Sequence, residues 1–154
     1  KSIGADVAVN YRAAPDFAAA VREACPGGAH LYFDNVGGKT LDVMLPAMRD
    51  FGRIVVCGMI ANYNNQDEQY PIRNLWQVLV HRITMKGYLA YEHLDMLPEA
   101  EERLTQWILS GRMRPLENVT TGLANTPGAF IRLMSGETTG KTIVRLNENV
   151  SKLA

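Results

Sequence analysis

The sequence predicts an α/β fold built on a parallel β-sheet, and three observations lead to this prediction. Short apolar segments alternate with longer segments in which apolar residues recur at helical spacing. Residues 52–58 are almost entirely apolar, which is typical of a strand buried on both faces of a parallel sheet. The strand predicted at residues 30–34 is followed by Gly37, Gly38 and then a helical pattern. This alternation favours parallel strands joined by right-handed helical crossovers.

The predicted elements follow one another at regular spacing. Pro15 favours the start of a helix, the Pro-Gly-Gly run at residues 26–28 favours its end, and Gly111 ends the longest helix. The predicted strands cover residues 7–11, 30–34, 52–58, 83–90, 119–123 and 141–146. The predicted helices cover residues 15–24, 39–49, 72–82, 93–110 and 126–135.

Composition and charge exclude several classes of function. The balance of 16 basic and 16 acidic residues gives no net charge, which argues against nucleic acid or an anionic membrane as a partner. No apolar stretch approaches the ~20 residues of a membrane helix. Cys25 and Cys57 stand apart, and His30, His81 and His93 are isolated, so we expect no disulfide framework and no metal site. These observations predict a protein of the reducing cytoplasm.

The predicted binding site lies beyond the carboxyl ends of the strands, where open α/β sheets bind ligands. This rule nominates residues 35–38, 57–59 and 88–91, which follow three successive strands. The glycine pair alone is weak evidence for phosphate binding, because a tight strand-to-helix turn is its more frequent explanation and the G-x-G-x-x-G pattern is absent. Tyr63 lies in a polar loop beside this edge. It is either an exposed loop tyrosine or a catalytic group, since loops often carry such groups.

Five segments together resemble the zinc-independent medium-chain dehydrogenase/reductases. They are residues 4–11, the YFDNVGG motif at 32–38, residues 52–60, the Asn-Tyr-Asn motif at 62–64 and the GKTIV motif at 140–144. Within that superfamily the chain resembles the leukotriene B4 dehydrogenase / prostaglandin reductase group of double-bond reductases. The resemblance covers nearly the whole chain, and it is specific because the motifs occur together.

The resemblance implies an NADP(H)-dependent oxidoreductase that reduces the carbon–carbon double bond of small α,β-unsaturated ketones and aldehydes. In the family, hydride passes to the β-carbon, and negative charge collects on the carbonyl oxygen. Tyr63 matches the tyrosine that polarises this oxygen together with a ribose hydroxyl of the cofactor. The resemblance therefore makes Tyr63 the candidate catalytic residue, in agreement with the electrostatic demand of the reaction.

The resemblance also implies which residues contact the cofactor. Asn35 matches a contact to the nicotinamide ribose, and Tyr11 matches a contact to the adenosine 2′-phosphate. The backbone of residues 88–90 matches the segment that pairs with the carboxamide, and Thr139 replaces an Asn that often reaches the cofactor. The full candidate set is Tyr11, Asn35, Gly37, Gly38, Cys57, Gly58, Tyr63, Tyr88, Leu89, Ala90 and Thr139. We expect the two adjacent glycines to admit the ribose without a Cβ in the way.

The chain is expected to be a fragment, because it starts without a Met and in the middle of a helix-to-strand pattern. The resemblance places the glycine-rich phosphate loop, the lysine for the 2′-phosphate and most of a barrel-like catalytic domain before Lys1. Of the family's strand order 3-2-1-4-5-6, the chain would keep the third to sixth strands. We therefore predict an incomplete, Rossmann-like, doubly wound sheet over residues 1–115, and a segment returning to the catalytic domain over residues 116–154.

Three alternatives remain open from the sequence. The first reading is an enone reductase acting as a homo-oligomer, a dimer, although the fragment by itself is expected to be inactive. The second is a quinone reductase of the same superfamily. The third is a truncated, non-catalytic module that only binds a nucleotide or associates with itself.

Overall fold

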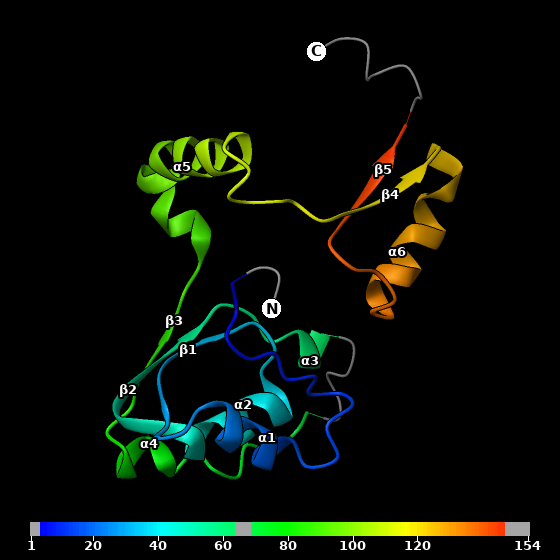
Figure 1. The fold of residues 1–154 in the computed structure, drawn as a ribbon. Coiled ribbons are helices and arrows are strands. Elements are labelled where there is room, and N and C mark those ends of the chain that lie inside the picture. Colours follow the sequence, from blue (N-terminus) through cyan, green and yellow to red (C-terminus); the bar gives the residue numbers. More distant parts are fainter. Residues whose placement is uncertain (1–3, 64–68, 147–154) are drawn as a thin grey trace. The chain divides into compact units, whose positions relative to one another are not determined.

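The computed structural model describes residues 4–63 and 69–146, and the chain divides into two compact units, Lys1–Glu92 and His93–Ala154. Each unit has its own parallel sheet (Figure 1). Asn64, part of one motif in the family resemblance, lies outside the described residues. The predicted division at residue 115 follows the domains expected of a longer protein and stays a prediction.

The first unit is built on three parallel strands in the order β1-β2-β3, as the sequence predicted. They are β1 (Ala29–Asp34), β2 (Met48–Val56) and β3 (Thr84–Gly87). Asp34 pairs with Val56, which in turn pairs with Gly87, so the three strands end at the same level. The carboxyl ends of the strands therefore form one common edge.

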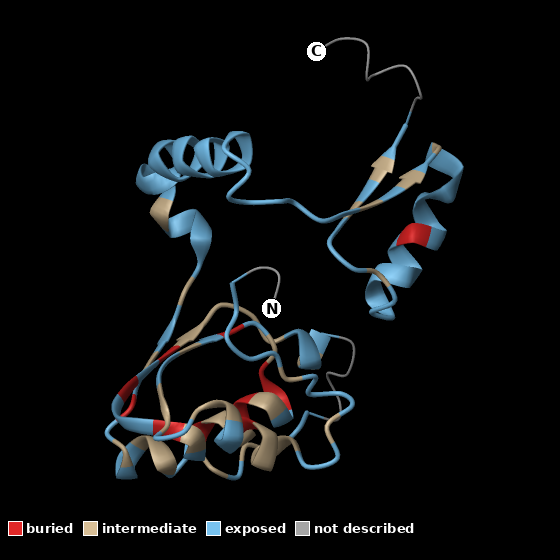
Figure 2. Cartoon of the chain, in the orientation of Figure 1, coloured by how far each residue is buried: buried red, intermediate tan, exposed pale blue. Residues whose placement is uncertain are grey.

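Four helical segments of this unit lie together on one side of the sheet (Figure 1). They are α1 (Phe17–Ala24), α2 (Gly38–Met44), the 3₁₀ turn η1 (Leu45–Ala47) and α4 (Gln77–Val80). The Asp16 side chain caps α1 by accepting the N–H of Ala19 at 2.9 Å. The buried core forms where α2 and η1 meet β2, and the buried residues cluster there in Figure 2. Its members are Leu41, Leu45, Met48, Ile54 and Ile83.

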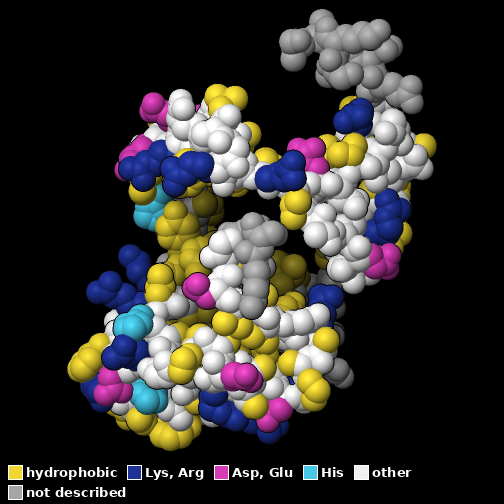
Figure 3. Space-filling view, in the orientation of Figure 1, with side chains coloured by type: hydrophobic (Ala, Val, Ile, Leu, Met, Phe, Trp, Pro, Cys, Tyr) yellow, Lys and Arg dark blue, Asp and Glu magenta, His cyan; other side chains and the backbone are white. Residues whose placement is uncertain are grey.

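Apolar side chains also remain on the surface of the first unit, as the space-filling view shows (Figure 3). On β1, Leu31 and Phe33 are 62% and 53% exposed. They are two residues apart on a strand, so they share one face of the sheet. Tyr32, between them, packs against the core on the opposite face. Among the described residues, β1 pairs only with β2, so its other edge is unpaired.

The predicted strand at residues 7–11 is wrong. Residues 7–10 form no strand, and residues 11–13 form a turn. The side-chain oxygen of Asn10 accepts the N–H groups of Arg12 and Ala13 at 3.0 and 3.2 Å and so closes this turn. A strand needs a neighbour to bind its backbone N–H and C=O groups, and no described strand pairs with this segment.

The helix predicted at residues 72–82 is much shorter, because only α4 forms. The cause is Asp42, whose Oδ1 accepts the N–H groups of Arg73 and Asn74 at 2.8 and 2.7 Å. The Oδ2 atom of Asp42 accepts the hydroxyl of Tyr70 at 3.2 Å. This buried carboxyl group on α2 holds the segment before α4 in a non-helical path.

The second unit contains the longest helix and a two-stranded parallel sheet. The predicted helix at 93–110 is divided, since the 3₁₀ segment η2 (Ala90–Met96) has non-helical angles at His93 and precedes α5 (Leu97–Leu109). The sheet comprises β4 (Glu117–Thr121) and β5 (Lys141–Arg145), joined through η3 (Leu123–Asn125) and α6 (Thr126–Met134). The predicted strand–helix–strand order of this segment is confirmed.

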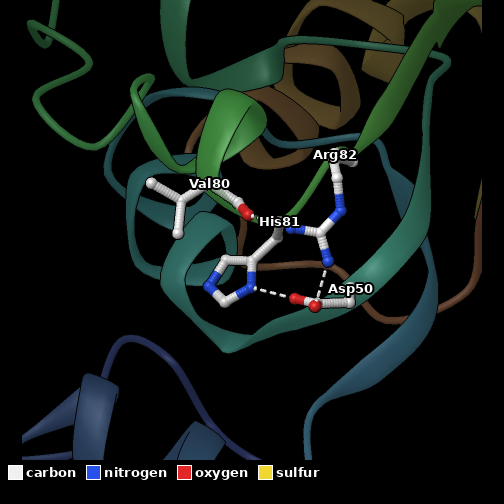
Figure 4. A network of polar contacts seen from close by, with 4 residues as sticks. All are labelled: Asp50, Val80, His81 and Arg82. Atoms are coloured by element: carbon white, nitrogen blue, oxygen red, sulfur yellow. Dashed lines mark hydrogen bonds and ion pairs between the residues drawn. The ribbon is translucent and has the colours of Figure 1, made fainter.

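A polar network joins β2 to the segment before β3 at the opposite end of the sheet from the carboxyl edge. Asp50 accepts from His81 Nδ1 at 2.8 Å and from the guanidinium of Arg82 (Figure 4). Arg82 also donates to the carbonyl of Val80 at 2.8 Å, and its guanidinium lies 4.5 Å from the centre of the Phe51 ring. Phe51 and Arg82 have φ values of 61° and 50°, so the network supports backbone that non-glycine residues rarely adopt.

We expect Asp50→Asn to destabilise the fold only where Asp50 is ionised. The hydrogen bond from His81, then that from Arg82, lowers the pKa of Asp50 below its ordinary value of 3.8. A carboxyl group with a lowered pKa stabilises the fold above its unfolded pKa, and this contribution is lost as the pH falls through the folded value. Thermal unfolding should separate wild type from Asp50→Asn near neutral pH and bring them together below pH ~4. An equal difference at every pH would contradict this assignment.

Candidate functional site

The three strand ends meet at one edge of the first unit, as predicted. The backbone carbonyl of Asp34 accepts the N–H groups of Cys57 and Gly58 at 2.8 and 3.1 Å. The carbonyl of Val56 accepts the N–H of Tyr88 at 3.0 Å. These bonds continue the sheet beyond the regular strands and fix the turns that follow them.

A cleft of about 500 Å³ opens at this edge. Five of the candidate residues line it, namely Cys57, Gly58, Tyr63, Tyr88 and Leu89, and the other lining residues are Val56, Met59, Gly87 and Glu92. The walls are thus mainly apolar, with two tyrosines and one acidic side chain. Concave apolar sites with a few polar groups are the usual form of small-molecule and cofactor sites.

Tyr63 lies at this cleft at the end of α3 (Ile60–Tyr63). Its hydroxyl oxygen is 3.4 Å from the backbone nitrogen of Met59, which donates to it. A Cβ on Gly58 would come within 3.3 Å of this hydroxyl, so a glycine there gives the phenol room to approach the backbone. Tyr63 is 59% exposed, and its hydroxyl can donate its own proton to a ligand oxygen.

Close packing of α3 on the turn after β1 requires the two adjacent glycines, and the sequence did not predict this packing. Both have positive φ, 67° for Gly37 and 51° for Gly38, a region that glycine adopts without strain. A Cβ on Gly37 would lie 3.1 Å from the Met59 side chain, and one on Gly38 would lie 3.2 Å from the Cβ of Ala61. The glycines therefore allow α3 and the residue before it to pack closely on the turn after β1. Room for a cofactor ribose at this point stays a prediction.

The other candidate residues lie in different places. The carbonyl of Asn35 accepts the N–H of Ile60 at 3.2 Å, so Asn35 is part of the turn that supports α3. Ala90 begins η2 and does not line the cleft. Tyr11 lies in the turn before α1, with its ring centre 6.2 Å from that of Phe17. Thr139 belongs to the second unit, in the loop between α6 and β5.

Asp34 is the residue at this edge that sequence reasoning missed. It is fully buried, and its Oδ1 accepts the N–H groups of Val36 and Gly37 at 2.9 and 3.0 Å and the hydroxyl of Tyr32 at 2.7 Å. Burial, followed by the hydrogen bond to Asp34, raises the pKa of Tyr32 well above its ordinary value of 10.0. The available signal was an acidic residue at the end of an apolar strand, next to a glycine turn.

The described residues contain neither a cluster of metal ligands nor a membrane-spanning helix. No group of three or more His, Cys, Asp or Glu side chains there is placed to hold a metal ion. No helix in the described ranges 4–63 and 69–146 is long and apolar enough to cross a membrane.

The parallel sheet, the one-sided helical layer and the cleft at the carboxyl edge define a Rossmann-like α/β unit. The zinc-binding dehydrogenase family matches residues 1–109, and the chain belongs to this family. This match, together with the relatives below, confirms the resemblance drawn from the sequence.

The relatives come from plants, animals and bacteria. The chain is 38% identical to a 2-alkenal reductase (NADP(+)-dependent) of Nicotiana tabacum, over 94% of this chain and 42% of the relative. It is 36% identical to prostaglandin reductase 1 of Bos taurus, over 94% of this chain and 44% of the relative. The crystal structure of CurA in complex with NADPH from Vibrio vulnificus matches with a TM-score of 0.83 and 33% identity, over 94% of this chain and 44% of CurA. The chain thus spans less than half the length of these proteins.

Proposed function

We propose that this chain is the C-terminal part of an NADPH-dependent oxidoreductase that reduces the carbon–carbon double bond of α,β-unsaturated ketones and aldehydes. The observation that carries the proposal is the phenol of Tyr63, which accepts the N–H of Met59 at a mainly apolar cleft. The relatives, among them a 2-alkenal reductase, support the same reaction class. An apolar cleft also suits small enones, which carry little polar surface.

The residues at the carboxyl edge fit the nicotinamide half of NADP(H). The backbone turns after β1, β2 and β3 converge there, and the cleft is large enough for a nicotinamide ring and a small substrate. When bound, the cofactor supplies the hydride. We propose that the chain contributes to its site through Tyr11, Asn35, Gly37, Gly38, Cys57, Gly58, Tyr63, Tyr88, Leu89, Ala90 and Thr139.

The proposed role of Tyr63 is to donate its phenolic proton in a hydrogen bond to the carbonyl oxygen of the substrate. Reduction at the β-carbon places negative charge on that oxygen, and a fixed donor stabilises the charge as it develops. A bound substrate would displace water from the apolar lining around Val56, Met59 and Leu89, which would strengthen the interaction.

The test is an assay of the full-length reductase, meaning the complete polypeptide that carries this chain. NADPH oxidation is followed with a small enone, an enal and a quinone, and the product of each reaction is identified. Saturated ketone or aldehyde as the product supports the proposal. Turnover of the quinone alone would favour the quinone-reductase alternative, and NADPH binding without any turnover would favour the non-catalytic alternative.

We also propose that the full-length protein is a dimer located in the cytoplasm. In the first unit β3 lies at the edge of the described sheet, and its unpaired backbone can bind the same strand of a second copy. Cys25 and Cys57 are both free thiols, which suits a reducing compartment. Molecular mass from light scattering tests the dimer, and a monomer would exclude it.

We expect Tyr11→Phe in the full-length reductase to reduce the preference for NADPH over NADH. The phenol offers one hydrogen bond to the charged 2′-phosphate, worth roughly 1.5–3 kcal/mol, which corresponds to about 10- to 150-fold in affinity. The Arg12 guanidinium lies 5.8 Å from the Tyr11 ring centre, so it can share the phosphate and reduce the loss. The ratio of kcat/KM for the two cofactors measures the effect. An unchanged ratio would remove Tyr11 from the cofactor site.

A further inference from the structure

We propose that Asp34 is a positioning residue that fixes Asn35 and Tyr63 relative to each other at the cleft. This inference rests on the proposed function, because the two positioned residues are those assigned to the cofactor ribose and to the substrate oxygen. Asp34 itself does not line the cleft. It acts through hydrogen bonds to the backbone around it.

The first step is the carboxyl group. Its Oδ1 binds the N–H groups of Val36 and Gly37, the two residues that follow Asn35. The bond to Gly37 is buried, so an apolar side chain at position 34 would leave that N–H without a partner. The hydroxyl of Tyr32 donates to the same oxygen, and the raised pKa of Tyr32 keeps this phenol protonated. The buried side chain of Asp34 therefore fixes the turn that carries Asn35.

The second step is the backbone carbonyl of Asp34. It accepts the N–H groups of Cys57 and Gly58, the two residues that follow β2. The same residue thus fixes the turn after β1 through its side chain and the turn after β2 through its main chain. A Cβ at Gly58 would lie 3.3 Å from the Tyr63 hydroxyl, so the turn after β2 also adjoins this phenol.

The third step connects the turn to Tyr63. The carbonyls of Asn35 and Val36 accept the N–H groups of Ile60 and Ala61 at 3.2 and 3.0 Å. These are the first two residues of α3, and Tyr63 is the last. A shift of the turn would move α3, and the phenol with it, so that the phenol would no longer point at the developing charge. Misplacement of a reacting group by about 1 Å can cost ~100-fold in rate.

Asp42 provides a matched control. It is also buried, and its carboxyl group likewise accepts two backbone N–H groups and one tyrosine hydroxyl. Its partners, however, are Tyr70, Arg73 and Asn74, which do not line the cleft. Loss of either carboxyl group should cost stability, but only loss of the one at Asp34 should alter the site.

The experiment compares Asp34→Ala, Asp34→Asn and Asp42→Ala in the full-length reductase. For each variant we would measure Tm, NADPH affinity, kcat with an enone, and hydrogen exchange at the amides of Ile60 and Ala61. Asp34→Ala is expected to lower kcat by about tenfold or more, to weaken NADPH binding and to speed exchange at both amides. Asp34→Asn keeps one accepting oxygen without its charge and should fall between wild type and Asp34→Ala. Asp42→Ala should lower Tm similarly, with kcat, affinity and exchange close to wild type.

The proposal is overturned if Asp34→Ala changes kcat and NADPH affinity no more than Asp42→Ala does at a similar loss of Tm. If Asp34→Ala does not fold, the comparison of Asp34→Asn with Asp42→Ala decides in the same way. If the wild type reduces no enone, the proposed function fails separately. NADPH affinity and amide exchange in the same variants then decide whether Asp34 positions this edge.

Discussion

Tyr63→Phe in the full-length reductase is expected to lower kcat for an enone while cofactor affinity and stability stay nearly unchanged. Loss of one donor to a developing oxyanion costs ~10²–10³ in rate where that donor acts alone. Because the family resemblance assigns part of this task to a ribose hydroxyl of the cofactor, we expect a smaller loss, about 10- to 100-fold. The structural cost is low, since Tyr63 is largely exposed and, within the described residues, its hydroxyl accepts one long hydrogen bond, from Met59.

Tyr70→Phe is the matched control for this prediction. It removes the same hydroxyl group from the other end of the same loop, where the phenol donates to Asp42 and not to the cleft. It should lower Tm and leave kcat near the wild-type value, the opposite of the pattern for Tyr63→Phe. Unchanged steady-state rates for Tyr63→Phe would exclude this residue from the mechanism.

The second large effect concerns the 154-residue chain by itself, which is expected neither to reduce an enone nor to bind NADPH with micromolar affinity. The pyrophosphate of a dinucleotide normally binds to N–H groups of a glycine-rich loop and a helix N-terminus. The family resemblance places that loop before Lys1. The described cleft is lined by the turns after β2 and β3 and by the end of α3, which we propose for the nicotinamide half.

The isolated chain is also expected to associate with itself. The outer edge of β1 is unpaired among the described residues, and Leu31 and Phe33 expose apolar surface beside it. Such edges bind other strands. The double variant Leu31→Lys, Phe33→Lys should reduce the association, because charged side chains on an edge strand oppose pairing.

Calorimetry with NADPH and light scattering on the purified chain test both parts of this prediction. A monomer with micromolar NADPH affinity would contradict it. That result would mean that the chain completes a dinucleotide site in a way the family pattern does not predict.

The sequence determined the parallel sheet, the approximate position of most elements and the edge at which the candidate cleft opens. Burial of one face leaves a periodic pattern in the sequence, so the apolar run before Gly58 and the helical pattern after Gly38 predicted that β2 and α2 exist. Their boundary was wrong, because β2 begins at Met48, inside the helix predicted at 39–49. The rule for carboxyl ends of parallel strands then located the cleft, and the loop after β2 pointed to Tyr63.

Only the tertiary structure decided the conformation of segments in which long-range contacts outweigh the local preference for a strand or a helix. Residues 7–11 have strand-forming side chains, but no described strand pairs with them. The carboxyl group of Asp42 accepts the N–H groups of Arg73 and Asn74, which are 31 and 32 positions further along the chain. These bonds shorten the helix expected at 72–82. The buried carboxyl group of Asp34 likewise fixes the glycine turn by accepting the N–H groups of Val36 and Gly37. A periodic pattern records which face of an element is buried, but it does not record which backbone groups a buried carboxylate will bind.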